Sequence, residues 1–328
     1  MDGVNLFSPG HGTFLEGAQL LLALLGAPLL AGWVGAVRAV LSNRSPAGIL
    51  QPWRDLARLF RKETLLPEGT SFLFRAVPYV VFGTLAASTL FIPFLNTDPP
   101  LAPVADAVVL VGLFSLARMM MAFGAMDAGT PFGDLGGRRE MMVGFLAEPA
   151  TLMILFTASL WSRSTSLPAI IHSFLDSADP FHPSLLFALL AFILVFLAEN
   201  GRLPIDNPAT HLELTMIHEA MLLEYSARHL ALMEWASSLK LFNYACVGFA
   251  LFFPWGIATH GVDGTGTLLL AIVALLGKLA VAGAVLALIE SISAKLRLFR
   301  APEYLAIAFL LAVLGLLVHL LLGANTHA

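Results

Sequence analysis

Eight long runs of apolar residues alternate with polar connections along the chain. An α-helix needs roughly 20 apolar residues to cross about 30 Å of hydrocarbon. With no water at that depth, each run must be helical to satisfy its own backbone. The pattern therefore predicts an all-α, polytopic membrane protein with about eight transmembrane helices. The predicted spans are residues 14–37, 76–95, 104–123, 142–161, 183–199, 239–258, 267–289 and 303–322.

The basic residues gather in alternate connections. Of the 18 Lys and Arg residues, all but Arg163 and Lys278 lie in or beside the first, third, fifth and seventh connections. The positive-inside rule places these odd connections in the cytoplasm. We therefore expect one integral membrane domain over residues 1–328, in the inner membrane of a bacterial or archaeal cell. Both termini are expected on the outer, periplasmic side.

Composition limits the chemistry that the chain can carry. Hydrophobic residues make up 58% of it, and Cys246 is the single cysteine. One cysteine cannot supply the thiolates of an iron–sulfur cluster. The sequence also shows no phosphate-binding loop and no nucleophile elbow. We expect no cofactor, metal or redox centre bound by the chain itself, and no nucleic-acid partner.

The first cytoplasmic connection predicts an amphipathic helix over residues about 49–62. Apolar residues recur there at helical spacing, charged residues take the opposite face, and Pro52 suits a first helical turn. Such a helix anchors a protein to the membrane surface, against anionic headgroups. An alternative is that it also braces a docked cytoplasmic subunit.

The third connection, residues 127–140, contains four glycines and one proline. These residues favour tight turns and argue against a continuous helix. Arg138 and Arg139 stand beside glycines, which allow a close backbone approach. The segment is expected to be a docking loop, and the alternative is a flexible surface loop.

The fifth connection predicts an acidic cytoplasmic segment over residues about 199–238. A helix is expected from about Ala209, which would place Glu213 and Glu224 on one face and pair Glu224 with Arg228. Leucines and methionines interleave with the acids, so some carboxylates must face protein or a wet cavity. A solvated loop is one alternative. A metal site built from His211, His218 and His229 is another, although no HExxH motif is present.

Ionisable residues also occur within the predicted spans. They include Arg118, Glu148 and Lys278, with Glu290 at the inner end of the seventh span. Charge in hydrocarbon is expensive, so such residues usually face a protein interior or water and often mark ion paths. Pro149 additionally frees a backbone carbonyl that can hold water near Glu148. The alternative is a purely structural polar contact.

Four blocks of sequence carry a family resemblance. They are Asn43-Arg44 with Gly48 to Asp55, Gly129 to Glu140, Glu199 to Asp206, and Leu223-Glu-Tyr-Ser226. In this order they resemble the respiratory complex I subunit 1 family. Within it, the third connection and Gly201 are most similar to the membrane subunit of group 4 [NiFe]-hydrogenases and formate hydrogenlyases. Ile205 and Ala227 depart from the family, which usually has phenylalanine and often glycine there.

The resemblance implies an eight-helix, non-catalytic subunit of an oxidoreductase complex, located where a soluble redox arm meets the membrane arm. It implies that the Glu199–Asp206 block faces the redox arm and that Glu224 belongs to an acidic funnel for energy coupling. The implied partners are hydrogenase large and small subunits, iron–sulfur subunits, antiporter-like membrane subunits and the lipid bilayer. The [NiFe] centre and iron–sulfur clusters are expected in those partners.

The sequence and the resemblance together nominate two groups of residues. The expected proton or ion path contains Glu148, Glu199, Asp206, Glu213, Glu224, Arg228, Lys278 and Glu290. The residues expected to dock the soluble arm are Arg138, Arg139, Glu140, Arg202, His211 and His218. Two other functions stay open. One is the quinone-site subunit of a complex I-like NADH:quinone oxidoreductase, and the other is a free-standing ion transporter, which would be expected to show inverted repeats.

Overall fold

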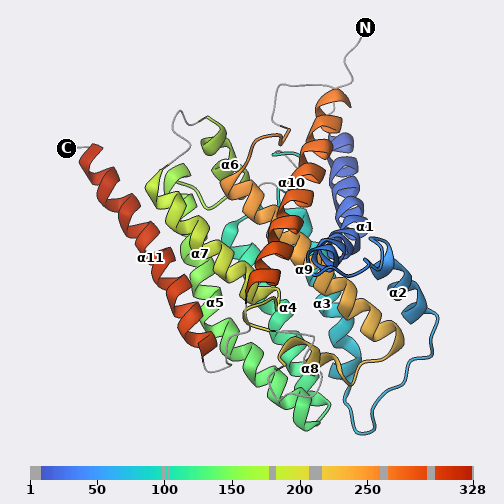
Figure 1. Cartoon of the computed structure of the whole chain (residues 1–328). Coiled ribbons are helices and arrows are strands. Elements are labelled where there is room, and N and C mark those ends of the chain that lie inside the picture. Colours follow the sequence, from blue (N-terminus) through green and yellow to red (C-terminus); the bar gives the residue numbers. More distant parts are fainter. Residues whose placement is uncertain are drawn as a thin grey trace.

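The structure is a computed structural model that describes residues 9–97, 101, 104–176, 182–206, 216–258, 265–293 and 300–326. Every named element in these ranges is an α-helix (Figure 1). The helices are α1 (Pro9–Leu41), α2 (Gln51–Phe60), α3 (Phe72–Phe91), α4 (Ala107–Asp127), α5 (Pro131–Ser162), α6 (Leu167–Leu175), α7 (Pro183–Glu199), α8 (His218–Leu222), α9 (Ala227–Phe252), α10 (Thr265–Ile292) and α11 (Ala301–Thr326).

Each of the eight predicted spans overlaps one long helix over most of its length, so the predicted all-α membrane fold is confirmed. In the described part of the chain, six helices are long and apolar enough to cross a membrane: α1, α3, α4, α5, α10 and α11. The helix α7 is apolar but has only 17 residues. The helix α9 has 26 residues and carries Arg228, Glu234 and Lys240 among its first fourteen.

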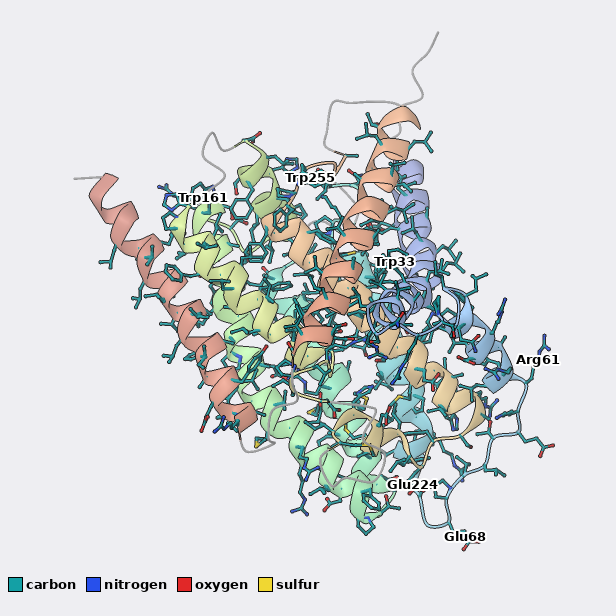
Figure 2. All side chains as sticks on the ribbon, in the orientation of Figure 1. Trp33, Arg61, Glu68, Trp161, Glu224 and Trp255 are labelled. Carbon is teal, nitrogen blue, oxygen red and sulfur yellow. The ribbon has the colours of Figure 1, made fainter. Side chains whose placement is uncertain are left out.

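The eight long helices alternate in direction through the bundle. The start of α1 and the end of α11 lie at one end, whereas α8 and the start of α5 lie at the other, which we name the α8 end (Figure 1). Glu68 and Glu224 are found at the α8 end, and Trp161 and Trp255 at the opposite end (Figure 2). The α8 end is therefore where the basic odd connections meet. That it faces the cytoplasm stays a prediction.

The third connection is mostly helical, so the prediction of tight turns across it was wrong. Helix α5 begins at Pro131, and the Thr130 hydroxyl caps it by accepting a hydrogen bond from the Gly133 amide. A Cβ on Gly133 would lie 2.6 Å from the Ala125 carbonyl, and one on Gly136 would lie 3.0 Å from the Ile217 carbonyl. These glycines allow α5 to pack closely on its neighbours, and do not form turns.

The fifth connection also differs from its prediction. Helix α8 has five residues, and the chain then turns at Leu223–Ser226 before α9 begins. Glu224 therefore lies outside any helix, and no ion pair joins it to Arg228 in the described ranges. The predicted helical pairing of these residues was wrong. His211 and Glu213 lie outside the described residues.

The amphipathic helix is confirmed as α2, but its apolar face packs partly on its own bundle. The Trp53 and Trp235 rings meet edge to face, with their centroids 5.5 Å apart. The Trp53 indole also donates a hydrogen bond of 3.2 Å to the Leu25 carbonyl, and Leu56 is 3% exposed. Helices α1 and α9 thus fix the position of α2.

A buried polar network joins α1, α3 and α9 inside the bundle. The Asn243 amide donates hydrogen bonds of 2.9 Å to the Leu85 carbonyl and to the Ser88 hydroxyl, and it accepts one from Thr89. The Gln19 amide donates to the Thr89 carbonyl at 3.1 Å. Polar side chains of this kind hold membrane helices together.

Candidate functional site: a buried ion cluster

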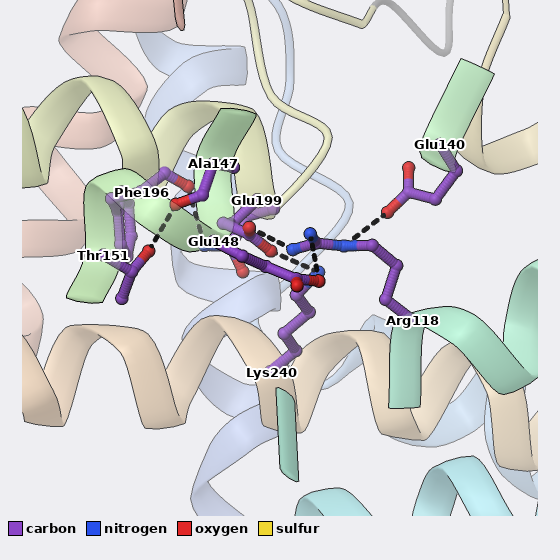
Figure 3. Close-up of polar contacts among 9 residues, drawn as sticks. Arg118, Glu140, Ala147, Glu148, Thr151, Phe196, Glu199 and Lys240 are labelled. Carbon is purple, nitrogen blue, oxygen red and sulfur yellow. Dashed lines mark hydrogen bonds and ion pairs between the residues drawn. The ribbon is translucent and has the colours of Figure 1, made fainter. Parts of the chain in front are cut away.

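Five ionisable side chains from four helices meet inside the bundle (Figure 3). They are Arg118 on α4, Glu140 and Glu148 on α5, Glu199 on α7 and Lys240 on α9. We name them the buried ion cluster. Each is far apart from most of the others in sequence, so only the folded bundle brings them together.

The Arg118 guanidinium is the centre of this cluster. Its Nη1 lies 3.0 Å from Glu148 Oε1 and its Nε lies 3.4 Å from Glu140 Oε1, while its Nη2 pairs with Glu199. The second Glu199 oxygen lies 3.1 Å from the Lys240 ammonium. The Arg118 and Glu199 side chains are 2% and 1% exposed. Removing one partner of such a buried pair strands a charge, at a cost of about 3–5 kcal/mol.

The spacing of residues on α5 explains how one guanidinium reaches two of its carboxylates. Glu140, Gly144 and Glu148 recur every four residues, so they share one helix face. A Cβ on Gly144 would lie 2.5 Å from Arg118 Nη1. The guanidinium therefore crosses the helix over Gly144, between the two glutamates, because that position has no side chain.

Two small cavities border the cluster, and His218 lines both. One has a volume of about 20 Å³ and also touches Arg118 and Lys240. The other has a volume of about 10 Å³ and also touches Glu140 and Glu199. Each is close to the size that holds a single water molecule. Burial lowers the pKa of His218, which favours a neutral imidazole between these cavities.

The connection after α7 begins with a tight helix ending. The Arg202 amide donates to the Leu197 carbonyl at 2.9 Å, and the Gly201 amide donates to the Ala198 carbonyl at 3.1 Å. Gly201 has a φ of +55°, in the left-handed region that favours glycine. This is a Schellman ending, and it turns the chain sharply beside the cluster.

The three charged residues of the Glu199–Asp206 block each contact a different part of the protein. Glu199 belongs to the buried ion cluster. Arg202 pairs with Glu290 on α10 at 3.1 Å, and Arg38 on α1 pairs with the same carboxylate at 3.3 Å. Asp206 accepts hydrogen bonds from the Ile217 and His218 amides at 3.2 and 2.9 Å, which fixes the start of α8. The residues 199–206 thus tie the cluster to α10 and to the α8 end.

Some residues of the predicted path are brought together and others are not. Glu148 and Glu199 share Arg118, and Asp206 lines the smaller cavity beside them. Glu224 lies next to Tyr225, whose ring stacks on Phe74 with centroids 4.2 Å apart. The Tyr225 hydroxyl lies against Gly124, six residues from Arg118 on α4, which is about 9 Å along the helix axis. Glu224 is therefore about two turns nearer the α8 end than the cluster.

Lys278 lies apart from the cluster, in the middle of α10. Its ammonium donates hydrogen bonds to the Phe253 carbonyl, at 2.7 Å, and to the Trp255 carbonyl. It also lies 4.4 Å from the centroid of the Trp255 ring. These contacts satisfy the carbonyls at the end of α9, which is a structural use of the charge.

The residues predicted to dock a soluble arm separate into two groups. Arg138 is a surface residue, with its side chain 72% exposed and paired with Asp134. Arg139 instead donates a hydrogen bond of 3.2 Å to the Met216 carbonyl and holds the segment before α8. Glu140 pairs with Arg118, Arg202 pairs with Glu290, and His218 lines the two cavities. A docking role for these three residues stays a prediction.

Two cluster residues, Arg118 and Lys240, are missing from both predicted groups, and Glu140 was predicted to dock the soluble arm and not to belong to the path. The signal for Arg118 was its charge within an apolar span, together with glutamates on either side of Gly144 on α5. Lys240 looks in the sequence like one more basic residue of a connection. Only the folded bundle, in which α9 contacts α7, brings it to Glu199.

Metal ligation has no structural support in the described ranges. No group of three or more His, Cys, Asp and Glu side chains there is placed to hold a metal ion.

In the described part of the chain, eight long helices with paired charges between them define a polytopic membrane protein. The chain belongs to the NADH dehydrogenase family, whose profile matches residues 20–321. The resemblance to complex I subunit 1, and to its hydrogenase branch, is confirmed.

Two relatives and one solved structure show which members of the family the chain is similar to. It is 34% identical over 290 residues to formate hydrogenlyase subunit 4 of Escherichia coli K12, which covers 87% of this chain and 91% of that protein. It is 32% identical over 241 residues to hydrogenase-4 component C of the same organism, covering 74% and 75%. A chain of the membrane-bound sulfane sulfur reductase, an archaeal respiratory membrane complex, has the same fold. Its TM-score is 0.79 with 18% identity, over 94% of this chain and 99% of that one.

Proposed function

We propose that this chain is the membrane-anchoring and energy-coupling subunit of a hydrogenase-type complex similar to formate hydrogenlyase. It holds a soluble redox arm at the α8 end and relays the redox state of that arm to proton or ion movement. The arm contains the hydrogenase and iron–sulfur subunits, which carry the [NiFe] centre and the clusters. Antiporter-like membrane subunits complete the complex. The names of the two relatives in E. coli support this assignment.

The observation that carries the coupling role is the buried ion cluster. Three carboxylates surround one guanidinium and one ammonium, which leaves one net negative charge when all five groups are ionised. All three carboxylates contact the same guanidinium. A small displacement of Arg118 toward one carboxylate therefore weakens its ion pairs with the other two.

The residues 199–206 provide the mechanical link that such a relay requires. Asp206 is bonded to the start of α8, at the proposed docking end, and Glu199 is bonded to Arg118 inside the bundle. A charge change in a docked arm acts on α8 first. It reaches Arg118 through this short connection, and the neighbouring cavities supply room for the water that moves a proton.

Docking itself is assigned to the surface of the α8 end. Arg138 presents its charge to solvent on the first turns of α5, and it is a direct contact for an acidic partner surface. Arg139 and Asp206 position the segment before α8, and do not need to touch the partner.

The variant Glu148→Gln tests the coupling role with little risk to folding. Glu148 is the most exposed carboxylate of the cluster, with its side chain 32% exposed, and glutamine still accepts a hydrogen bond from Arg118. The intact complex is purified through a tag on this chain. Three quantities are measured: retention of the soluble arm, hydrogen evolution in detergent, and ion uptake into sealed proteoliposomes per hydrogen evolved.

We expect the soluble arm and the hydrogen evolution in detergent to be retained. The ion-to-hydrogen ratio should fall by about tenfold or more, because the glutamine cannot take up a proton and a change of about 1.4 kcal/mol in proton affinity already changes occupancy tenfold. The matched control is Glu303→Gln, which removes an exposed carboxylate on α11. An unchanged ratio in Glu148→Gln contradicts the coupling role. A parent complex that purifies without the soluble arm contradicts the docking role.

A further inference from the structure

An apolar groove of about 340 Å³ lies between α7, α9 and α10 (helices labelled in Figure 1). All fifteen of its lining residues are apolar, and five of them are phenylalanines, including Phe192 and Phe249. It opens to the surface of the bundle, where Val281 and Val285 are 66% and 49% exposed. A dry groove of this kind in a membrane is filled by hydrocarbon.

Charges mark both ends of the groove. Its far end is closed by Phe253, whose carbonyl accepts a hydrogen bond from Lys278. On α10, Ala282 and Leu286 line the groove, and Glu290 is the next residue of the same stripe toward the α8 end. Glu290 holds Arg38 and Arg202, so the three residues carry one net positive charge.

The arginines retain the capacity to bind an anion. A guanidinium has five N–H donors. Glu290 accepts one hydrogen bond from each arginine. The Arg38 and Arg202 side chains are 47% and 25% exposed. An anion at the mouth of the groove is therefore met by charge-assisted hydrogen bonds.

The length of the groove matches one leaflet. Its lining on α10 runs from Val281 to Ile289, which is about 12 Å of helix. Half of the hydrocarbon core is about 15 Å. An acyl chain that starts beside Arg202 therefore fits between the two charged ends.

From these features we infer that the groove binds one acyl chain of an anionic phospholipid from the leaflet at the α8 end, with its phosphate held by Arg202 and Arg38. Basic pockets between membrane helices on the cytoplasmic side recognise anionic headgroups. A helix of a partner subunit fits less well, since membrane helix interfaces are rich in small residues. The inference does not rest on the coupling role, because no residue of the buried ion cluster lines the groove.

The test uses the intact complex in nanodiscs of either phosphatidylglycerol or phosphatidylcholine. Each nanodisc contains a small amount of the same lipid with a photoreactive acyl chain, and labelled residues are mapped by mass spectrometry. We expect labelling of α7, α9 and α10 residues that line the groove, several times stronger with phosphatidylglycerol. Ala282→Phe, which fills the groove, should abolish this labelling. Leu288→Phe, on the exposed face of the same helix, should leave it unchanged.

The headgroup contact is tested by Arg38→Gln. Loss of one cation near the surface is worth about 1 kcal/mol, so the preference for the anionic lipid should fall by about fivefold. Absence of groove labelling in both lipids, as a partner helix in the groove would produce, overturns the inference. Equal labelling by the two lipids also overturns it, because the groove then takes hydrocarbon without reading the headgroup.

Discussion

Arg118 and Lys278 are both cations within predicted membrane spans, and both are buried. Arg118 is surrounded by three carboxylates from two other helices, whereas Lys278 is bonded to two backbone carbonyls at the end of α9. Carboxylates gain and lose protons, and backbone carbonyls do not. A buried charge therefore indicates an ion path only when its partners can titrate.

The same comparison distinguishes two glutamates of the predicted path, Glu148 and Glu224. Glu148 shares Arg118 with two other acids, so the charge on each of the three acts on the same guanidinium. Glu224 lies in the turn before α9, about two helical turns away, and its neighbour Tyr225 is the residue fixed by packing. The cluster is where coupling is concentrated, and Glu224 lies at its approach.

The largest effect is expected from Arg118→Gln. It leaves Glu199 with only Lys240 and leaves Glu140 and Glu148 without a cation, so the stability should fall by about 3–5 kcal/mol. The free energy of unfolding is measured by titrating the purified subunit in detergent with SDS. The double variant Arg118→Gln with Glu199→Gln should recover part of the loss. No recovery would mean that the two side chains act independently.

Lys278→Gln should have a smaller, purely structural effect. The amide has two N–H donors but is shorter than lysine, so it keeps a hydrogen bond to only one of the Phe253 and Trp255 carbonyls, and the lost bond costs about 1–3 kcal/mol. The ion-to-hydrogen ratio in proteoliposomes should match that of the parent complex. A fall in this ratio without loss of the soluble arm would place Lys278 in the ion path, and Lys278 would then not differ from Arg118 in function.

Gly144→Ala tests whether the crossing point of Arg118 matters. The new Cβ would lie 2.5 Å from Arg118 Nη1, and relief of that clash should cost about 1–3 kcal/mol and lower the ion-to-hydrogen ratio. The control is Gly112→Ala on α4, where nothing lies within 4 Å of the added atom. The control should be neutral or slightly stabilising, since alanine favours helix by up to about 1 kcal/mol.

The smallest effect is expected at Ala227, outside both charged sites. Its φ of +46° lies in the left-handed region, which costs a residue with a Cβ roughly 1–2 kcal/mol. Ala227→Gly should therefore stabilise the protein by about 0.5 kcal/mol after the entropy of glycine is counted. The shift in thermal midpoint checks it, with Ala231→Gly in the regular part of α9 as a destabilising control. A lower midpoint for Ala227→Gly would contradict the backbone argument.

The sequence predicted the helices well because apolar length and charge alternation are local properties. It failed to predict the start of α5, because a glycine-rich segment is typical of turns. Gly133 and Gly136 instead lie in α5 and allow it to pack closely on its neighbours. It also failed for Lys240, because nothing local distinguishes a cation that reaches Glu199 from one in solvent. The Glu199–Asp206 block was recognised from the resemblance, but its three separate contacts are visible only in the fold.

The most direct test of the account is redox-difference infrared spectroscopy of the intact complex. Reduction of the soluble arm should change the infrared band of a protonated carboxyl group, because the proposed relay runs through the Glu148 carboxylate beside Arg118. The band should be lost in Glu148→Gln and retained in Lys278→Gln. A band that persists in Glu148→Gln, or one that disappears in Lys278→Gln, would contradict the assignment of coupling to the buried ion cluster.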